Sequence, residues 1–121
     1  MVKRRSQLEH DEMVQTVAEH LESERFTEVK ADLPDYDRPD KIVWKNTGSG
    51  HIPDVTADGL LVEVETADSI DDAHTEDQWT LFGAHAEQHN KTFVVVVPRG
   101  SRSAAQRRLR ELGITAKVWT V

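Results

Sequence analysis

The chain has 121 residues, and we expect residues 1–121 to form a single domain of ordinary size. Apolar residues make up 37% and charged residues 31%, a balance that favours a folded globular protein, and no apolar run reaches membrane-spanning length, so we expect a cytoplasmic protein without a membrane partner. The absence of cysteine excludes disulfide scaffolds, thiolate metal sites and thiol nucleophiles, and the net charge of −7 argues against avid, non-specific binding of nucleic acid.

The first third of the sequence predicts a helix and a short strand. Ser6 and Glu9 have the spacing of a capping box, and apolar residues then recur at helical intervals, so we expect a helix over residues 7–24. Residues 26–31 favour a strand. Two prolines between residues 33 and 40 predict a break after it.

The middle of the sequence predicts a β-hairpin. Residues 42–44 favour a strand, 47–50 a loop and 52–56 a further extended segment. Asp58-Gly59 is a strong turn signal, since glycine adopts positive φ without penalty. We therefore expect residues 52–56 to pair antiparallel with the strand at 60–65.

Residues 71–121 alternate between predicted helices and strands. Residues 71–90 have helical length, and the Val-rich run at 93–97 is typical of a strand covered on both faces. Residues 103–106 offer a capping box for a helix that ends at Gly113, and residues 114–121 alternate like a strand. The whole order, α-β-β-β-α-β-α-β, predicts an α/β fold with a mixed sheet flanked by helices.

Three acids near the Asp58-Gly59 turn are candidate metal ligands. Asp54 and Glu63 flank the turn, and Glu63 and Glu65 share one face of their strand because they lie two residues apart. Mg²⁺ or Mn²⁺ prefers converging oxygen ligands of this kind, and a cation would relieve the repulsion among them. The alternative is an exposed edge hairpin whose acids are simply solvated.

These residues resemble the active-site motif of the PD-(D/E)xK nuclease superfamily, which includes restriction endonucleases and Holliday junction resolvases. Pro53-Asp54 is followed, after eight intervening residues, by Glu63-Val64-Glu65. The resemblance covers roughly residues 7 to 97 and implies a restriction-endonuclease-like α-β-β-β-α-β core, to which this chain adds a C-terminal helix and strand. It also implies Mg²⁺-dependent hydrolysis of DNA. Residues 63–79 also look like those of a group of small uncharacterised prokaryotic proteins.

The resemblance assigns roles to only part of the motif. Asp54 and Glu63 match the metal-binding acids, whereas Glu65 stands where the family usually has a lysine. A glutamate cannot act as an ammonium, but it could be a third metal ligand or a base. Lys45, on the preceding strand, could supply the missing charge, although a surface role suits it better.

Other residues could complete such a site. Family members often carry a glutamate on the first helix, which Glu9 or Glu12 could provide, and some place a glutamine on the helix after the third strand, which Gln78 matches. His74, at the start of that helix, could contact the metal or a phosphate, since a helix N-terminus favours anions. Each of these residues could instead be a surface residue, and His74 could also cap the helix.

Basic residues are concentrated toward the C-terminus. Residues 98–121 hold six of the 15 basic residues but one of the 22 acidic ones. This patch could contact DNA phosphates or be a solvated helix face. His85 and His89 have the i, i+4 spacing of metal ligands, but no third ligand is evident and we interpret them as surface residues. The arginines of the patch are Arg99, Arg102, Arg107, Arg108 and Arg110, among which Arg102, Arg107 and Arg108 are the candidate DNA contacts.

Three functions remain open from the sequence. The first is a metal-dependent phosphodiesterase acting on DNA. The second is a catalytically inactive module of the same fold that binds nucleic acid or a protein partner. The third is a subunit of a homodimer or larger assembly, for which Trp44, Trp79 and Trp119 could form a contact surface or simply be core residues.

Overall fold

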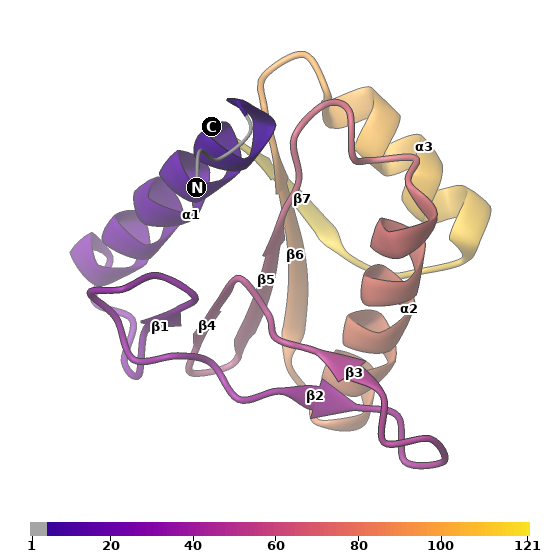
Figure 1. Ribbon diagram of the computed structural model, residues 1–121, viewed down its shortest axis with the longest axis horizontal. Helices are drawn as coiled ribbons and strands as arrows, with labels where there is room; N and C mark the ends of the chain where they lie inside the picture. The colour runs from indigo at the N-terminus through magenta and orange to yellow at the C-terminus, as the bar shows by residue number, and fades with distance from the viewer. Residues whose placement is uncertain (1–4) are drawn as a thin grey trace.

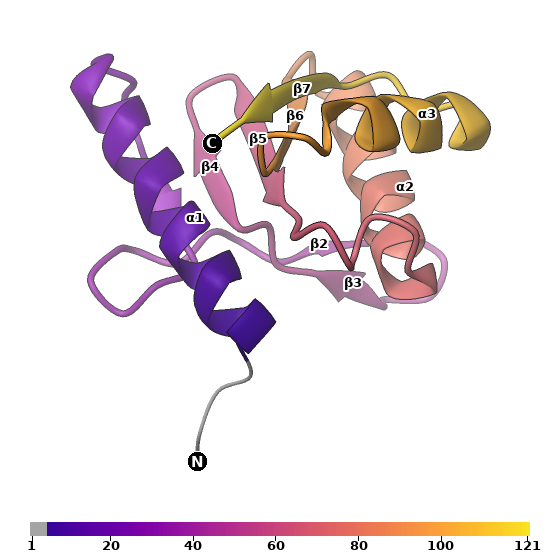
Figure 2. The ribbon, with the colours of Figure 1, turned by 90° about the horizontal axis from the view of Figure 1, so that it is seen from above.

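A mixed five-stranded sheet separates one helix from two others in the computed structural model, which describes residues 5–121 (Figures 1 and 2). Helix α1 (Arg5–Ser23) covers one face of the sheet, and α2 (Ala73–Gln88) and α3 (Arg102–Leu112) cover the other. In spatial order the strands are β1 (Lys30–Ala31), β4 (Val55–Ala57), β5 (Leu60–Val64), β6 (Thr92–Val97) and β7 (Lys117–Thr120).

The strand directions follow from the connections. Strands β1, β4 and β5 run antiparallel, and the Asp58-Gly59 turn joins β4 to β5 with Val55 opposite Val62. Helix α2 then crosses over so that β6 lies parallel to β5, and α3 does the same for β7. The expected α/β architecture, its mixed sheet and its hairpin are therefore confirmed.

The sheet buries apolar side chains on both faces. Val62 and Val64 pack toward α1, whereas Leu61, one residue away, packs toward α2 and α3. Every residue of β6 after Thr92 is buried, which confirms the expected strand with two covered faces. The inward face of α1 is formed by Met13, Val14, Val17, Ala18 and Leu21.

The β2–β3 hairpin is a separate two-stranded sheet that the sequence only half predicted. Strand β2 (Ile42–Val43) was expected, but Gly50, assigned to a loop, belongs to β3 (Gly50–His51). A Cβ at Gly50 would lie 1.9 Å from the carbonyl oxygen of Ile42, so only glycine permits this close pairing. The strand expected at 26–31 is also shorter than predicted, because only Lys30 and Ala31 pair with β4.

The helix ends also differ in detail from expectation. Ser6 lies inside α1 rather than capping it, and α3 begins at Arg102, so the expected capping box at 103–106 is wrong. The N–H of Ser101 donates to the carbonyl oxygen of Pro98, and Ser101 occupies the cap position without a side-chain hydrogen bond. Gly113 ends α3 as expected, and its N–H donates to the carbonyls of Leu109 and Arg110.

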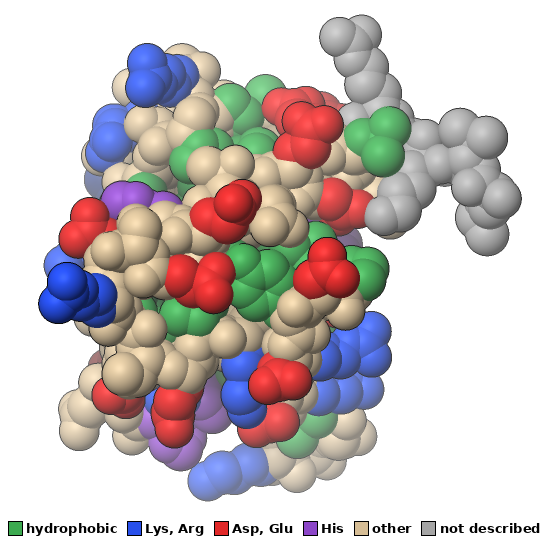
Figure 3. Space-filling model, turned by 90° about the vertical axis from the view of Figure 1, so that its left-hand side faces the viewer, with side chains coloured by type: hydrophobic (Ala, Val, Ile, Leu, Met, Phe, Trp, Pro, Cys, Tyr) green, Lys and Arg blue, Asp and Glu red, His purple; other side chains and the backbone are tan. Residues whose placement is uncertain are grey.

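The surface offers little support for an aromatic contact patch. Trp79 is completely buried, and Trp44 and Trp119 are partly buried against opposite faces of the sheet, so the three side chains do not share one surface. On the face shown in Figure 3, Asp and Glu side chains are dispersed among uncharged side chains, and some lie beside Lys or Arg. Within residues 5–121, no helix has both the length and the apolar character needed to cross a membrane.

Candidate functional site

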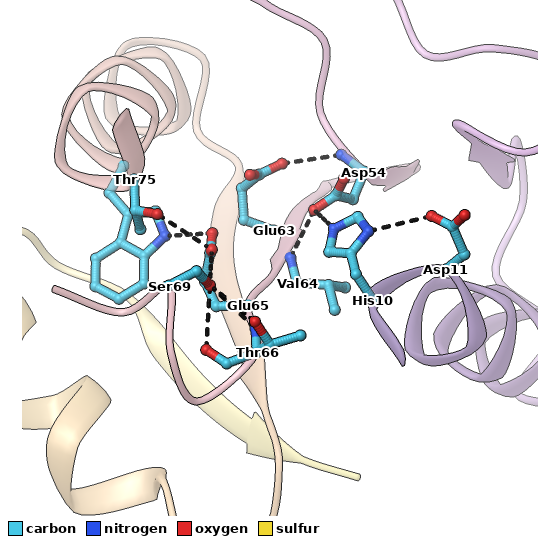
Figure 4. Close-up of polar contacts among 10 residues, drawn as sticks. His10, Asp11, Asp54, Glu63, Val64, Glu65, Thr66, Ser69 and Thr75 are labelled. Atoms are coloured by element: carbon cyan, nitrogen blue, oxygen red, sulfur yellow. Dashed lines mark hydrogen bonds and ion pairs between the residues drawn. The ribbon is translucent and has the colours of Figure 1, made fainter. Parts of the chain in front are cut away.

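The β4–β5 hairpin brings Asp54 and Glu63 together. Because Val55 lies opposite Val62, Asp54, the residue before β4, faces Glu63 near the end of β5. The backbone N–H of Asp54 donates to Glu63 Oε1 over 2.9 Å, and the N–H of Val64 donates to Asp54 Oδ2 over 2.8 Å (Figure 4). The turn therefore sets the register that the sequence predicted for these two acids.

Glu65, the residue after β5, is hydrogen-bonded to α2 and to the loop before it. Its Oε1 accepts from Ser69 Oγ at 2.8 Å and Thr75 Oγ1 at 3.3 Å, and its Oε2 accepts from Trp79 Nε1 at 3.2 Å (Figure 4). Both carboxylate oxygens are thus occupied by protein donors. Glu65 connects the end of β5 to the first turns of α2.

His10 on α1 supplies a cation beside these acids. Its Nε2 lies 3.2 Å from Asp54 Oδ2, and its Nδ1 lies 3.3 Å from Asp11 Oδ1. Since both ring nitrogens face carboxylate oxygens, both act as donors when the ring is protonated. Burial lowers the pKa of His10, but the hydrogen bond and charge of Asp54, with Asp11 and Glu65, outweigh it and raise the pKa to about 9.

The two glutamates are buried acids with raised pKa values. Glu63 is 1% exposed and Glu65 is 5% exposed. Burial, followed by the charges of Asp54 and Glu65, raises the pKa of Glu63 well above its usual value. Burial also raises the pKa of Glu65 to about 7, although the bonds from Ser69 and Trp79 and the charge of His10 oppose this. A proton or a cation is therefore favoured at this cluster.

His10 is the residue that sequence reasoning missed. Glu9 and Glu12, the acids considered for this place on the helix, are both exposed, and the structure does not bring them to the cluster. His10 lies one turn before Met13 and Val14, in phase with the buried face of α1. That helical phase was the available signal.

Only part of the expected ligand set fits a metal ion. Within residues 5–121, no three His, Cys, Asp or Glu side chains form a group that could hold one. Asp54 and Glu63 suit a cation as a pair, since Mg²⁺ is commonly held by one or two carboxylates with water completing its shell. Glu65, expected as a third ligand, is committed to its three donors instead.

Within the described residues, none of the remaining candidates makes a hydrogen bond or ion pair with the acids. Gln78 is half-buried on α2, and its side chain makes no hydrogen bond within the described part of the chain. His74 is exposed, and its ring meets that of His51 edge-on at 5.2 Å, while His51 Nε2 contacts Asp77 at 2.6 Å. Lys45 lines a different cleft and makes no ion pair with the acids.

The three candidate DNA-binding arginines have partners within the chain. Arg107 contacts Asp71 at 3.3 Å, and Arg108 contacts Glu76 at 3.4 Å. Arg102 donates to the carbonyl oxygen of Val118 over 2.9 Å. The basic face of α3 is therefore partly neutralised by acids at the start of α2. Exposed ion pairs of this kind are weak, so a phosphate could compete for them.

Comparison of the chain with known protein families, with curated proteins and with solved structures finds no match.

Proposed function

We propose that the chain is a metal-dependent phosphodiesterase acting on DNA, built on a restriction-endonuclease-like core. If the small β2–β3 hairpin is set aside, the elements run α1, β1, β4, β5, α2 and β6. This is the α-β-β-β-α-β order of the PD-(D/E)xK superfamily, with the acidic motif on the hairpin of its second and third strands. The element order and the motif position agree, which supports the proposal.

The observation that carries the proposal is the pairing of Asp54 with Glu63 across the β4–β5 turn. Asp54 and Glu63 would hold the cation, and Mg²⁺ bound there would polarise the phosphodiester and lower the pKa of an attacking water. His10 would orient Asp54 through its Nε2–H and offset negative charge, while Glu65 would fix the end of β5 against α2. His10 and Glu65 are thus positioning residues.

The test is cleavage of supercoiled, single-stranded and branched DNA with Mg²⁺ or Mn²⁺. We expect Asp54→Ala and Glu63→Gln each to reduce cleavage by roughly 10³-fold, because each removes several kcal/mol of charge stabilisation. Glu12→Gln is the matched control, since this acid is exposed on α1. An inert wild-type protein, or undiminished cleavage by Asp54→Ala, would contradict the proposal.

A specific observation also favours the second function, a binding module without catalysis. The residue at the position of the family lysine, Glu65, is buried and bonded to three side chains, and no lysine contacts the acids in the described residues. DNA retention that falls with salt, survives chelation and persists in Glu63→Ala, without any cleavage, would support this function over the first.

A further inference from the structure

An open cleft of about 760 Å³ lies at the other end of the β4–β5 hairpin, away from the acids. Its walls come from β2, from the ends of β4 and β5 nearest the turn, and from the C-terminal half of α2. The volume is in the range of small-molecule sites. Its apolar lining includes Ile42, Trp44, Leu61 and Leu81.

The rim of this cleft is basic, in contrast to the acidic chain as a whole. Four lysines line it, against two acids, Glu28 and Asp40. Within the part of the chain that the structure describes, none of the four makes an ion pair or a side-chain hydrogen bond. These charges are therefore available to an anion. The lysines are Lys30, Lys41, Lys45 and Lys91.

His85 and His89 form part of the same wall. Their rings lie 4.2 Å apart, and both line the cleft. Burial lowers the pKa of His85, and the charges of His89 and Lys91 lower it further, as expected beside a concentration of positive charge. Because they lie four residues apart on α2, His85 and His89 share one face of the helix and form a polar part of the cleft wall.

We propose that this cleft binds a nucleotide, with the phosphate among the lysines and the base against Trp44. Lysine ammonium groups bind phosphate as point charges, and an aromatic side chain stacks on any base through its π-face. Asn46 and Gln88 also line the cleft and offer amide groups to the base edge. The occupant is either a free nucleotide or an unpaired nucleotide of single-stranded DNA, which share this chemistry.

The site is separate from the acids and extends the proposed function. Leu61 lines the cleft and Glu63 lies two residues further along the same face of β5, a spacing of roughly 7 Å. None of the acids Asp54, Glu63 and Glu65 lines the cleft. Nucleotide binding should therefore require neither the metal nor the acids, and can be tested without them.

The experiment is titration calorimetry in EDTA with adenosine monophosphate, inorganic phosphate, adenosine and a short oligothymidylate. We expect saturable binding of adenosine monophosphate or the oligothymidylate, stronger than that of phosphate or adenosine. Preference for the monophosphate would identify a free nucleotide, and binding of the oligothymidylate alone would identify single-stranded DNA. The double variant Lys41→Glu/Lys91→Glu should weaken binding at least tenfold, and Trp44→Ala about fivefold or more.

Matched variants separate this site from general charge effects. Lys117→Glu reverses an exposed lysine on β7, outside the cleft, and should leave binding within about twofold of wild type. Asp54→Ala should also retain binding, even if it abolishes cleavage. The proposal is overturned if neither nucleotide binds saturably up to about 5 mM, or if phosphate binds as well as both. Equal binding by wild type and the double lysine variant, folded by circular dichroism, would also overturn it.

Discussion

The two ends of the β4–β5 hairpin handle charge in opposite ways. At one end, Glu63 and Glu65 are almost completely buried, and hydrogen bonds from the protein hold the acids in place. At the other end, lysines surround an open cleft and have no partner within the described residues. A buried charge needs fixed partners because desolvation is costly, whereas an exposed charge can remain unpaired until a ligand arrives.

The largest expected difference between the two ends is in stability. Trp79→Ala at the acid end removes a completely buried ring and its bond to Glu65, and should lower the free energy of unfolding by about 3–5 kcal/mol. Trp44→Ala in the cleft removes a partly buried ring and should cost only about 1 kcal/mol. Urea unfolding measures both. Equal losses of unfolding free energy in Trp79→Ala and Trp44→Ala would contradict the distinction between a packed acid end and an open cleft end.

The pH dependence of stability should come mainly from the acid end. Glu63, Glu65 and His10 all have raised pKa values in the folded protein, so each contributes stability below its unfolded pKa and loses it as the pH rises through its folded one. We therefore expect the metal-free protein to lose stability between pH 5 and pH 9. The part due to Glu65 is on the order of 3 kcal/mol and is lost as the pH rises from about 4.5 to about 7. Urea midpoints across this range provide the measurement.

Glu65→Gln isolates that contribution. Glutamine resembles the protonated acid in shape and stays neutral, so the variant should gain stability relative to wild type as the pH rises from 5 to 8. Lys41→Glu, at the open end, should keep the wild-type pH profile. Parallel profiles for wild type and Glu65→Gln would show that burial of this acid has no such effect.

The smallest effect is expected at Arg107, whose ion pairs with Asp71 and Glu111 lie at the surface. Arg107→Ala should change the free energy of unfolding by about 0.2–1 kcal/mol and lose that difference in high salt. Thermal unfolding at two salt concentrations measures it. A larger change, insensitive to salt, would place Arg107 among the structural residues with Trp79.

Most of the fold was predictable because the burial of one or both faces of a helix or strand imposes a periodic pattern of apolar residues on the sequence. The Val-rich β6, the apolar stripe of α1 and the Asp58-Gly59 turn each signal their structure locally. The β3 strand was missed because Gly50 looks like a loop residue, and only its close approach to Ile42 explains it. The start of α3 was misplaced because Ser101 caps it without the usual side-chain bond.

Sequence reasoning predicted only the part of the candidate site that is formed by two adjacent strands. The positions of Asp54 and Glu63 follow from one turn and the alternation of a strand. The helical phase of His10 places it beside the buried face of α1, but its contact with Asp54, like that of Glu65 with Trp79, depends on how the helices pack against the sheet, which no local pattern encodes. The cleft likewise combines residues from segments far apart in the chain.

The most direct test of Asp54 and Glu63 as the metal ligands is titration calorimetry with Mn²⁺ at pH 7.5. It compares the wild-type protein with Asp54→Asn, Glu63→Gln and Glu65→Gln. We expect one saturable site in the wild type, weakened at least tenfold, or about 1.4 kcal/mol, by Asp54→Asn and by Glu63→Gln and largely retained in Glu65→Gln. Absence of Mn²⁺ binding, or binding that is unchanged when Asp54 and Glu63 are replaced, would contradict the assignment of this pair as the metal ligands.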